Sequence, residues 1–193
     1  MCDHEVTQQE YEQVMGNNPS HFKGPNHPVE NITWKEAVKY CEKLTQQERA
    51  AGRIAEDQEY RLPTEAEWEF AARAETTTVV PSNLNEISWN ITNAGRSTHP
   101  VAGKLPNEWG LYDMLGNVWE YCSDNRTFYE EKIVINPNQI DPGDTRAIIG
   151  GAFDSDARVL RPAKRWHYGM DGRQPQIGFR LSFGKNRKIQ KPK

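Results

Sequence analysis

The sequence predicts an α+β domain rich in loops, with two or three helices followed by short strands. Three helix starts lie within the first 75 residues, and no helical period is sustained after residue 74. Over residues 76–150, short apolar stretches alternate with clusters of Asn, Pro, Gly and Asp, which interrupt regular structure. Helices in one part of a chain and short strands in another are typical of the α+β class.

Each predicted helix begins with a threonine that is followed three residues later by a glutamate, which is the spacing of a capping box. The three pairs are Thr7 with Glu10, Thr33 with Glu36, and Thr64 with Glu67. We expect the first helix to end at the turn formed by residues 16–19, which read Gly-Asn-Asn-Pro.

The second helix has the clearest apolar stripe in the sequence. Apolar residues recur at the spacing of one helix face at Trp34, Ala37, Val38, Cys41 and Leu44. Cys41 is therefore expected in the core. The third helix follows Pro63, which fits a helix start, and it is expected to bury Ala66, Phe70 and Ala71.

Two apolar stretches near the C-terminus are expected to form buried strands. Residues 147–149 precede the glycine pair Gly150-Gly151, and residues 177–183 read Ile-Gly-Phe-Arg-Leu-Ser-Phe. Arg180 lies within the second stretch, and a guanidinium on an apolar strand is a natural partner for a buried carboxylate.

Length and charge indicate one domain with an acidic body. A chain of 193 residues is long enough for one substantial core. The net charge is −3, and the last ten residues carry five basic side chains and no acid, so residues 1–183 hold a charge of −8. We expect residues 1–183 to form the domain and residues 184–193 to be a disordered basic tail. An acidic body argues against nucleic acid as a partner.

No apolar run approaches the roughly 18 residues of a membrane span. The three cysteines, Cys2, Cys41 and Cys122, have neither zinc-site spacing nor the even count of a disulfide framework. Reduced thiols of a cytoplasmic protein are the favoured interpretation, and the compartment stays open. The chain enters folded sequence at once, so we expect that a longer protein has been cut upstream, where an export signal would lie.

Six motifs occur in a fixed order along the chain. They are residues 5–11, 27–34, 60–69 and 107–120, the pair Gly150-Gly151, and residues 177–180. In this order they resemble the formylglycine-generating enzyme family, also called the sulfatase-modifying-factor domain. The resemblance spans nearly the whole chain up to Phe183 and implies a variant of the C-type lectin fold. The family's usual opening strand, upstream of Glu5, is missing.

The resemblance also implies that the family's chemistry is lost. Catalytic members oxidise a substrate cysteine to formylglycine with molecular oxygen, using two copper-binding cysteines five residues apart. Those positions fall at about Ala157 and Pro162 here, and neither side chain can ligate copper or act as a thiol. We therefore expect no copper site, no oxidase activity and no catalytic residues.

A structural calcium ion is implied by the same resemblance. Asp113, Gly116, Val118 and Glu120 match the family's ligand positions, with carboxylates from the outer two and backbone carbonyls from the inner two. Calcium takes such oxygen ligands. In the alternative interpretation, Asp113 caps the turn and Glu120 pairs with an arginine.

Residues 152–176 are the candidate recognition segment, because large aromatic rings and arginines lie there between two family-type structural motifs. Such residue types dominate binding hot spots, and loops of lectin-type folds carry recognition. The candidate ligand-binding residues are Phe153, Arg158, Arg161, Arg165, Trp166, His167, Tyr168, Met170 and Arg173. We expect Trp166, His167 and Tyr168 near the centre of an exposed surface.

The sequence thus predicts a non-catalytic binding module for a protein or small-molecule ligand. Two versions stay open: a domain appended to a bacterial signalling protein, and a variable protein whose C-terminal loop region is diversified by a retroelement system. The alternative class is an enzyme with an altered oxidoreductase site in the same fold.

Overall fold

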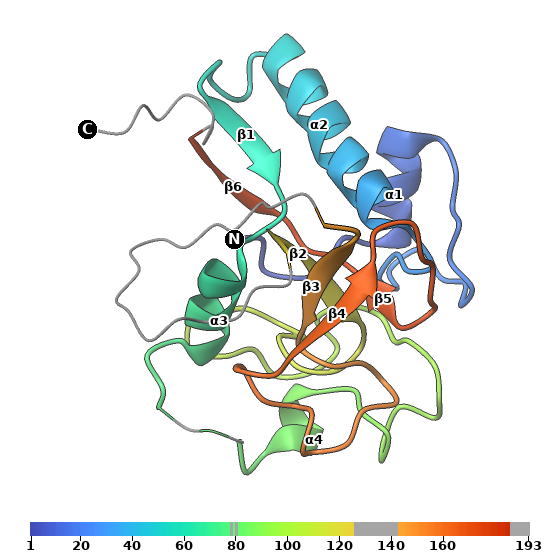
Figure 1. Cartoon of the computed structure of the whole chain (residues 1–193), viewed down its shortest axis with the longest axis vertical. Coiled ribbons are helices and arrows are strands. Elements are labelled where there is room, and N and C mark those ends of the chain that lie inside the picture. The colour runs from blue at the N-terminus through green and yellow to red at the C-terminus, as the bar shows by residue number, and fades with distance from the viewer. Residues whose placement is uncertain (78, 80, 126–142, 186–193) are drawn as a thin grey trace.

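A computed structural model of the chain describes residues 1–77, 79, 81–125 and 143–185 (Figure 1). The helices are α1 (Gln8–Met15), α2 (Trp34–Ala50), α3 (Glu65–Arg73) and α4 (Leu84–Ile87). The strands are β1 (Gln58–Arg61), β2 (Trp119–Asn125), β3 (Thr145–Ile149), β4 (Arg165–Gly169), β5 (Ile177–Gly178) and β6 (Ser182–Lys185). Strand β6 takes up the first two residues of the expected tail, and residues 186–193 lie outside the described part.

The three longer helices begin at the threonines that the sequence indicated. The side chains of Thr7, Thr33 and Thr64 each accept a hydrogen bond from the backbone N–H of the third helical residue, a glutamate. The carboxylate of that glutamate accepts a hydrogen bond from the backbone N–H of the threonine. These capping boxes satisfy backbone donors that no helical carbonyl reaches. Gly16, with φ of 84°, ends α1 in the left-handed conformation expected at a helix end.

The buried face of α3 differs from the expectation. Phe70 is 67% exposed, whereas Trp68 is fully buried, so the prediction of a buried Phe70 is wrong. The indole of Trp68 lies in the second core cluster and donates a hydrogen bond to Glu120 on β2, and Ala71 is buried on the same side. Glutamates flank Trp68 in the sequence, so the apolar pattern did not indicate that this side of the helix is buried.

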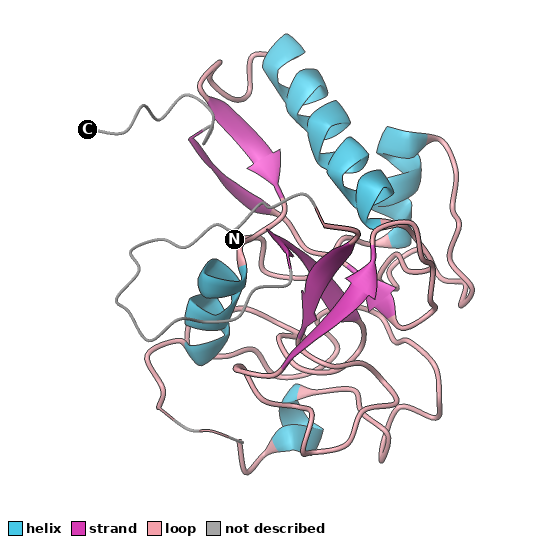
Figure 2. Ribbon diagram, viewed as in Figure 1, coloured by secondary structure: helices cyan, strands magenta, loops and turns pink. Residues whose placement is uncertain are grey.

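The strands form two separate sheets (Figure 2). The four-stranded sheet has the order β4-β3-β2-β5, antiparallel except for the β2–β5 pair, and β1 pairs antiparallel with β6. The strand expected over residues 177–183 is divided between these sheets. Its middle pairs instead with the N-terminal segment, since Val6 N donates to Phe179 O and Cys2 N to Leu181 O.

Two buried clusters make up most of the core. The first lies between α1, α2 and the strands and contains the rings of Tyr11, Tyr40 and Phe179, with Cys41 as predicted. The second lies under α3 and contains Trp68 and Cys122. Helix α2 runs beside α1 and β1 (Figure 1). Among the described residues, no helix has the length and apolar character needed to span a bilayer.

Candidate functional site

The resemblance places the family's two cysteines at about Ala157 and Pro162, in the loop between β3 and β4. Ala157 is exposed there, and Pro162 is buried. Each of them lines a surface pocket, and the two pockets share Ser82 and Asn83, so they adjoin. We call them the α3 pocket, beside Pro162, and the asparagine pocket, beside Ala157.

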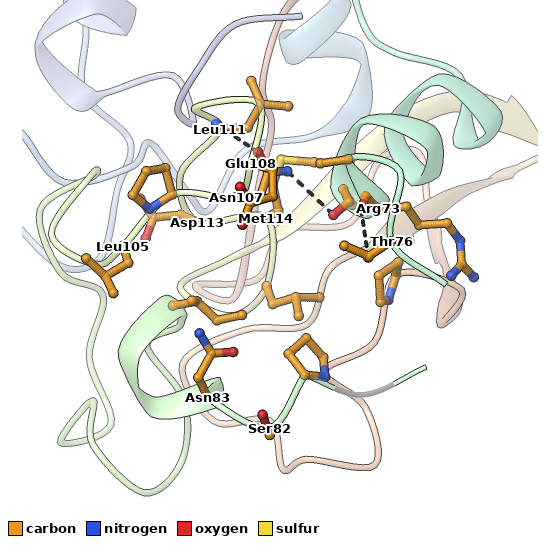
Figure 3. Close-up of a pocket in the computed structure, with 17 residues that line it drawn as sticks. Arg73, Thr76, Ser82, Asn83, Leu105, Asn107, Glu108, Leu111, Asp113 and Met114 are labelled. Carbon is orange, nitrogen blue, oxygen red and sulfur yellow. Dashed lines mark hydrogen bonds between the residues drawn. The ribbon is translucent and has the colours of Figure 1, made fainter. Parts of the chain in front are cut away.

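The α3 pocket has a volume of about 260 Å³ and opens at the C-terminal end of α3 (Figure 3). Its walls are mainly apolar, from Pro81, Ile87, Leu105, Leu111, Met114 and Pro162. Asn107 holds one wall in place. Its amide donates to the Ala71 carbonyl at 2.8 Å, and its Oδ1 accepts from the backbone N–H groups of Trp109 and Leu111. The pocket can take a small apolar group beside polar atoms of the rim.

The asparagine pocket, with a volume of about 360 Å³, is lined in part by asparagine and threonine side chains. Asn85 Oδ1 accepts hydrogen bonds from Asn90 Nδ2 and Thr92 Oγ1, each at 2.9 Å, which fixes these side chains relative to one another. Ile91 is 56% exposed in the same stretch. Asp156 and Ala157 close the other side. Amide and hydroxyl groups beside an exposed apolar side chain suit a ligand that offers both backbone-like polarity and apolar contact.

The candidate recognition residues lie in several environments. Trp166 is 59% exposed on β4, with the Lys164 ammonium 5.5 Å from its ring, as the exposed-surface hypothesis requires. Phe153 is 4% exposed and packs edge-on against Phe22, so it belongs to the core and cannot form part of an exposed surface. Tyr168 is half-buried and packs against the first core cluster.

The arginines of this segment are largely engaged within the fold. Arg165 Nε donates to Glu65 at 2.6 Å, and its Nη2 bonds Glu69, so β4 is clamped to α3. Arg173 binds the Glu36 carboxylate at 2.6 Å. Arg158 pairs with its neighbour Asp156 and is otherwise open to solvent.

The remaining candidates are all half-buried: Arg161, His167 and Met170. Backbone bonds anchor Met170, whose N–H donates to Asp144 O and whose carbonyl accepts from Trp34 N. The candidate surface therefore includes a regular strand, β4, where the sequence suggested irregular loop. Pairing of Ala147 with His167 and of Ile148 with Trp166 provides that strand, and this long-range pairing is not visible in the local sequence.

The predicted calcium ligands lie in a buried charged cluster. Both carboxylate oxygens of Glu120 accept from Arg180 at 2.7 Å, and Trp68 Nε1 adds a third hydrogen bond at 2.6 Å. Asp113 Oδ2 accepts from Ala102 N at 2.6 Å, whereas its Oδ1 is buried with no hydrogen-bond partner. Glu120 thus pairs with an arginine, as the alternative interpretation expects, whereas the hydrogen bond that Asp113 accepts comes from Ala102 in another loop and not from its own turn.

A third carboxylate, Glu5, adds to this cluster. It is fully buried and accepts from Asn117 Nδ2 at 2.7 Å and from Val118 N at 3.2 Å. Burial, together with the charges of Asp113 and Glu120, raises the pKa of Glu5 well above its ordinary value. Among the described residues, the Arg180 guanidinium is thus the one buried cation beside the carboxylates of Glu5, Asp113 and Glu120 in this cluster. The excess of negative charge fits an additional cation.

The turn next to this cluster requires glycine. Gly116 has φ of 83°, and a Cβ there would lie 2.1 Å from the Trp89 carbonyl oxygen. The charge balance and the unpartnered Asp113 oxygen fit a calcium ion. Glu120, which already accepts three hydrogen bonds, would have to share its oxygens with that ion. Calcium at Asp113, Gly116, Val118 and Glu120 stays a prediction.

Comparison with known proteins identifies the family. Residues 1–183 match the family described as "Sulfatase-modifying factor enzyme 1-like domain". The chain belongs to this family. The chain is 33% identical to the formylglycine-generating enzyme of Streptomyces coelicolor over 82% of its own length and 53% of that protein. It is 34% identical to the "Chaperone protein LppX" of Paenibacillus barcinonensis, over 62% of its own length and 59% of the relative. The chain thus spans less than two thirds of these curated relatives.

A solved structure agrees with the fold. The protein titled "Treponema denticola variable protein 1" superposes with a TM-score of 0.81 at 31% identity, covering 94% of this chain and 82% of that one. The predicted fold class, the C-type lectin-like fold of the formylglycine-generating-enzyme type, is therefore confirmed. The short helix α4 is added to the two or three helices that were expected.

The family comparison gives the pockets their significance. The resemblance places the family's catalytic thiols at about Ala157 and Pro162, and no cysteine lies among the residues that line either pocket. Cys41 and Cys122 are buried elsewhere in the core, and burial raises the pKa of both thiols above the ordinary value. Thiols of this kind are poor nucleophiles and poor metal ligands, because both roles need the thiolate.

Proposed function

We propose that this domain is a non-catalytic binding module of the sulfatase-modifying-factor family, with recognition through the two adjoining pockets and the exposed part of residues 152–176. The observation that carries this proposal is the placement of Ala157 and Pro162. Each lines a pocket, and the resemblance to the family predicts a cysteine at about each of these positions in catalytic members. A site that keeps its concave shape and lacks its reactive groups is suited to binding.

The chemistry of the pockets favours an extended peptide-like ligand. An apolar side chain fits the α3 pocket, between Leu105 and Pro162, while amide groups of the ligand can bond to Asn83 and Thr92 in the asparagine pocket. The shared wall at Ser82 and Asn83 allows one chain to pass over both. Trp166, exposed on β4, is the candidate for an additional aromatic contact.

The similarity to a variable protein of Treponema denticola supports the version in which the loop region is diversified. Relatives named formylglycine-generating enzyme support the second candidate, an enzyme with an altered site in the same fold. The two classes differ in one respect that can be tested: the enzyme must convert its ligand.

A random-peptide display library selected against the immobilised domain tests the proposal. We expect enriched peptides whose affinity, measured by fluorescence anisotropy, falls at least tenfold for Ala157→Trp, since the new ring fills the asparagine pocket. Trp166→Ala should weaken the same peptides by about 1–4 kcal/mol. Ala55→Trp, at an exposed alanine remote from both pockets in sequence, is the matched control and should bind normally.

Two results would count against this function. Peptides that bind all variants equally would place recognition outside the pockets. Chemical conversion of a bound peptide, seen as a change of mass, would favour the altered enzyme instead.

A further inference from the structure

Three consecutive side chains near the N-terminus bring a sulfur, an oxygen and a nitrogen atom together. The ligand atoms of Cys2, Asp3 and His4 all lie within 4.8 Å of one another, and no other group of three or more such residues is found among residues 1–77, 79, 81–125 and 143–185. We propose that these residues form a binding site for a zinc-class transition-metal ion, with ligands other than those of the neighbouring calcium positions and of the pockets.

Two of the three separations between ligand atoms are close to those around a tetrahedral ion. Cys2 Sγ lies 3.7 Å from Asp3 Oδ1, and His4 Nε2 lies 3.6 Å from the same oxygen. Zinc binds sulfur, nitrogen and oxygen at about 2.0–2.3 Å, which places neighbouring ligand atoms about 3.3–3.6 Å apart. Small side-chain rotations would bring all three atoms to one ion.

The orientation of the imidazole also favours a metal. His4 Nδ1 lies 2.7 Å from the Glu5 carbonyl oxygen, which can only accept, so Nδ1 carries the proton. Nε2, the other ring nitrogen, faces Asp3 and is the atom that would coordinate the ion. A backbone carbonyl that holds one ring nitrogen while the other coordinates is the usual arrangement around metal-bound histidine.

The backbone holds the three residues in this arrangement. Cys2 N donates to Leu181 O at 2.7 Å, and Tyr112 N donates to Asp3 O at 2.8 Å. In a regular strand, Asp3 would point away from Cys2 and His4. The chain bends at Asp3 and His4 instead, which brings all three side chains to one side. The backbone therefore places all three side chains close together without an ion.

The surroundings leave room for entry and for a fourth ligand. The Asp3 side chain is 61% exposed and that of His4 is 25% exposed. With three protein ligands, a tetrahedral ion keeps one position for water or an incoming group.

Cobalt(II) is a suitable probe, because its thiolate complexes absorb in the near ultraviolet and its tetrahedral complexes absorb in the visible. Titration of the 193-residue chain should give both bands with one ion bound, and zinc should displace the cobalt. Cys2→Ser should remove the thiolate band, and His4→Ala should weaken the affinity at least tenfold. His21→Ala, at an exposed histidine elsewhere, is the matched control and should leave both unchanged.

Near-ultraviolet circular dichroism of each variant confirms that the fold is kept, which is expected because the anchoring bonds of Cys2 and Asp3 come from the backbone. The proposal is overturned if the native chain shows no cobalt bands. It is also overturned if Cys2→Ser retains the thiolate band, since Cys41 or Cys122 would then supply the sulfur.

Discussion

Glu30 is fully buried, and only one of its carboxylate oxygens has a hydrogen-bond partner, the Phe22 N–H at 2.8 Å. Burial raises the pKa of Glu30 from 4.5 to about 7. The native state therefore favours the protonated form, and this contribution to stability is complete below pH 4.5 and is lost as the pH rises to about 7. At higher pH the loss is on the order of 2–3 kcal/mol.

Glu30→Gln should remove this dependence, because the amide keeps an acceptor for Phe22 and carries no charge. The variant should exceed the native chain in free energy of unfolding at pH 8 and match it more closely at pH 5, as measured by urea denaturation. Glu12→Gln, at an exposed position on α1, is the control. An equal effect of Glu30→Gln at both pH values would contradict the assignment.

Asp113 is the residue that tests calcium most directly. Its Oδ1 lacks a partner, whereas replacing Glu120 would also break the pair with Arg180. If calcium binds the native state, it should raise the melting temperature in proportion to the logarithm of its free concentration. Asp113→Asn should abolish this rise. An unchanged melting temperature of the native chain with calcium and with a chelator would exclude the site.

Single residues show both the reach and the limit of sequence reasoning. The capping threonines and Cys41 were predictable, since local spacing decides them. Phe70 and Phe153 were not, because their exposure depends on which face meets another part of the chain. An arginine within an apolar strand predicts a buried carboxylate partner. The sequence does not show that this partner is Glu120, 60 positions away, because only the folded structure brings the two together.

At the scale of elements, β4 and α3 are joined by Arg165, which bridges Glu65 and Glu69. Burial acts to raise the pKa of Glu69, but hydrogen bonds from Arg165 and Arg73 outweigh it and lower the pKa below its ordinary value. The bridge therefore stabilises the native state at neutral pH and is lost as the pH falls through the lowered pKa.

Arg165→Met should lower the free energy of unfolding by about 2–4 kcal/mol at pH 7, because the buried Glu65 loses this cation and Glu69 keeps only Arg73. The loss should shrink toward acid pH. Adding Glu65→Gln to Arg165→Met should recover part of the stability in a double-mutant cycle. Strictly additive effects of the two substitutions would show that the bridge contributes nothing.

The strands were harder to predict than the helices for a physical reason. A capping box lies within four residues, whereas β1 exists through its pairing with β6, more than 100 positions away. The segment 177–183 has the composition of one strand, yet the N-terminal segment takes its middle and divides it into β5 and β6. Strand formation here depends on partners that the local sequence does not contain.

At the scale of the whole molecule, the chain has the family fold, and the resemblance predicts that Ala157 and Pro162 replace the thiols of the oxidase site. The native chain should therefore leave a cysteine-containing sulfatase peptide unchanged when incubated with copper and oxygen, as judged by mass spectrometry. Cys41 and Cys122 are not expected to substitute, because both are buried in the core and neither lines either pocket.

The double variant Ala157→Cys/Pro162→Cys extends this test. It places two thiols five residues apart in the loop where the catalytic relatives have them, so it should gain a copper(I)-thiolate absorption that the native chain lacks. Ala55→Cys/Ala157→Cys supplies two thiols at unrelated positions and should not. Copper binding by the double variant without peptide conversion would show that the surrounding residues have also departed from catalysis. Conversion by the native chain, lost on substitution of Cys41 or Cys122, would overturn the non-catalytic assignment.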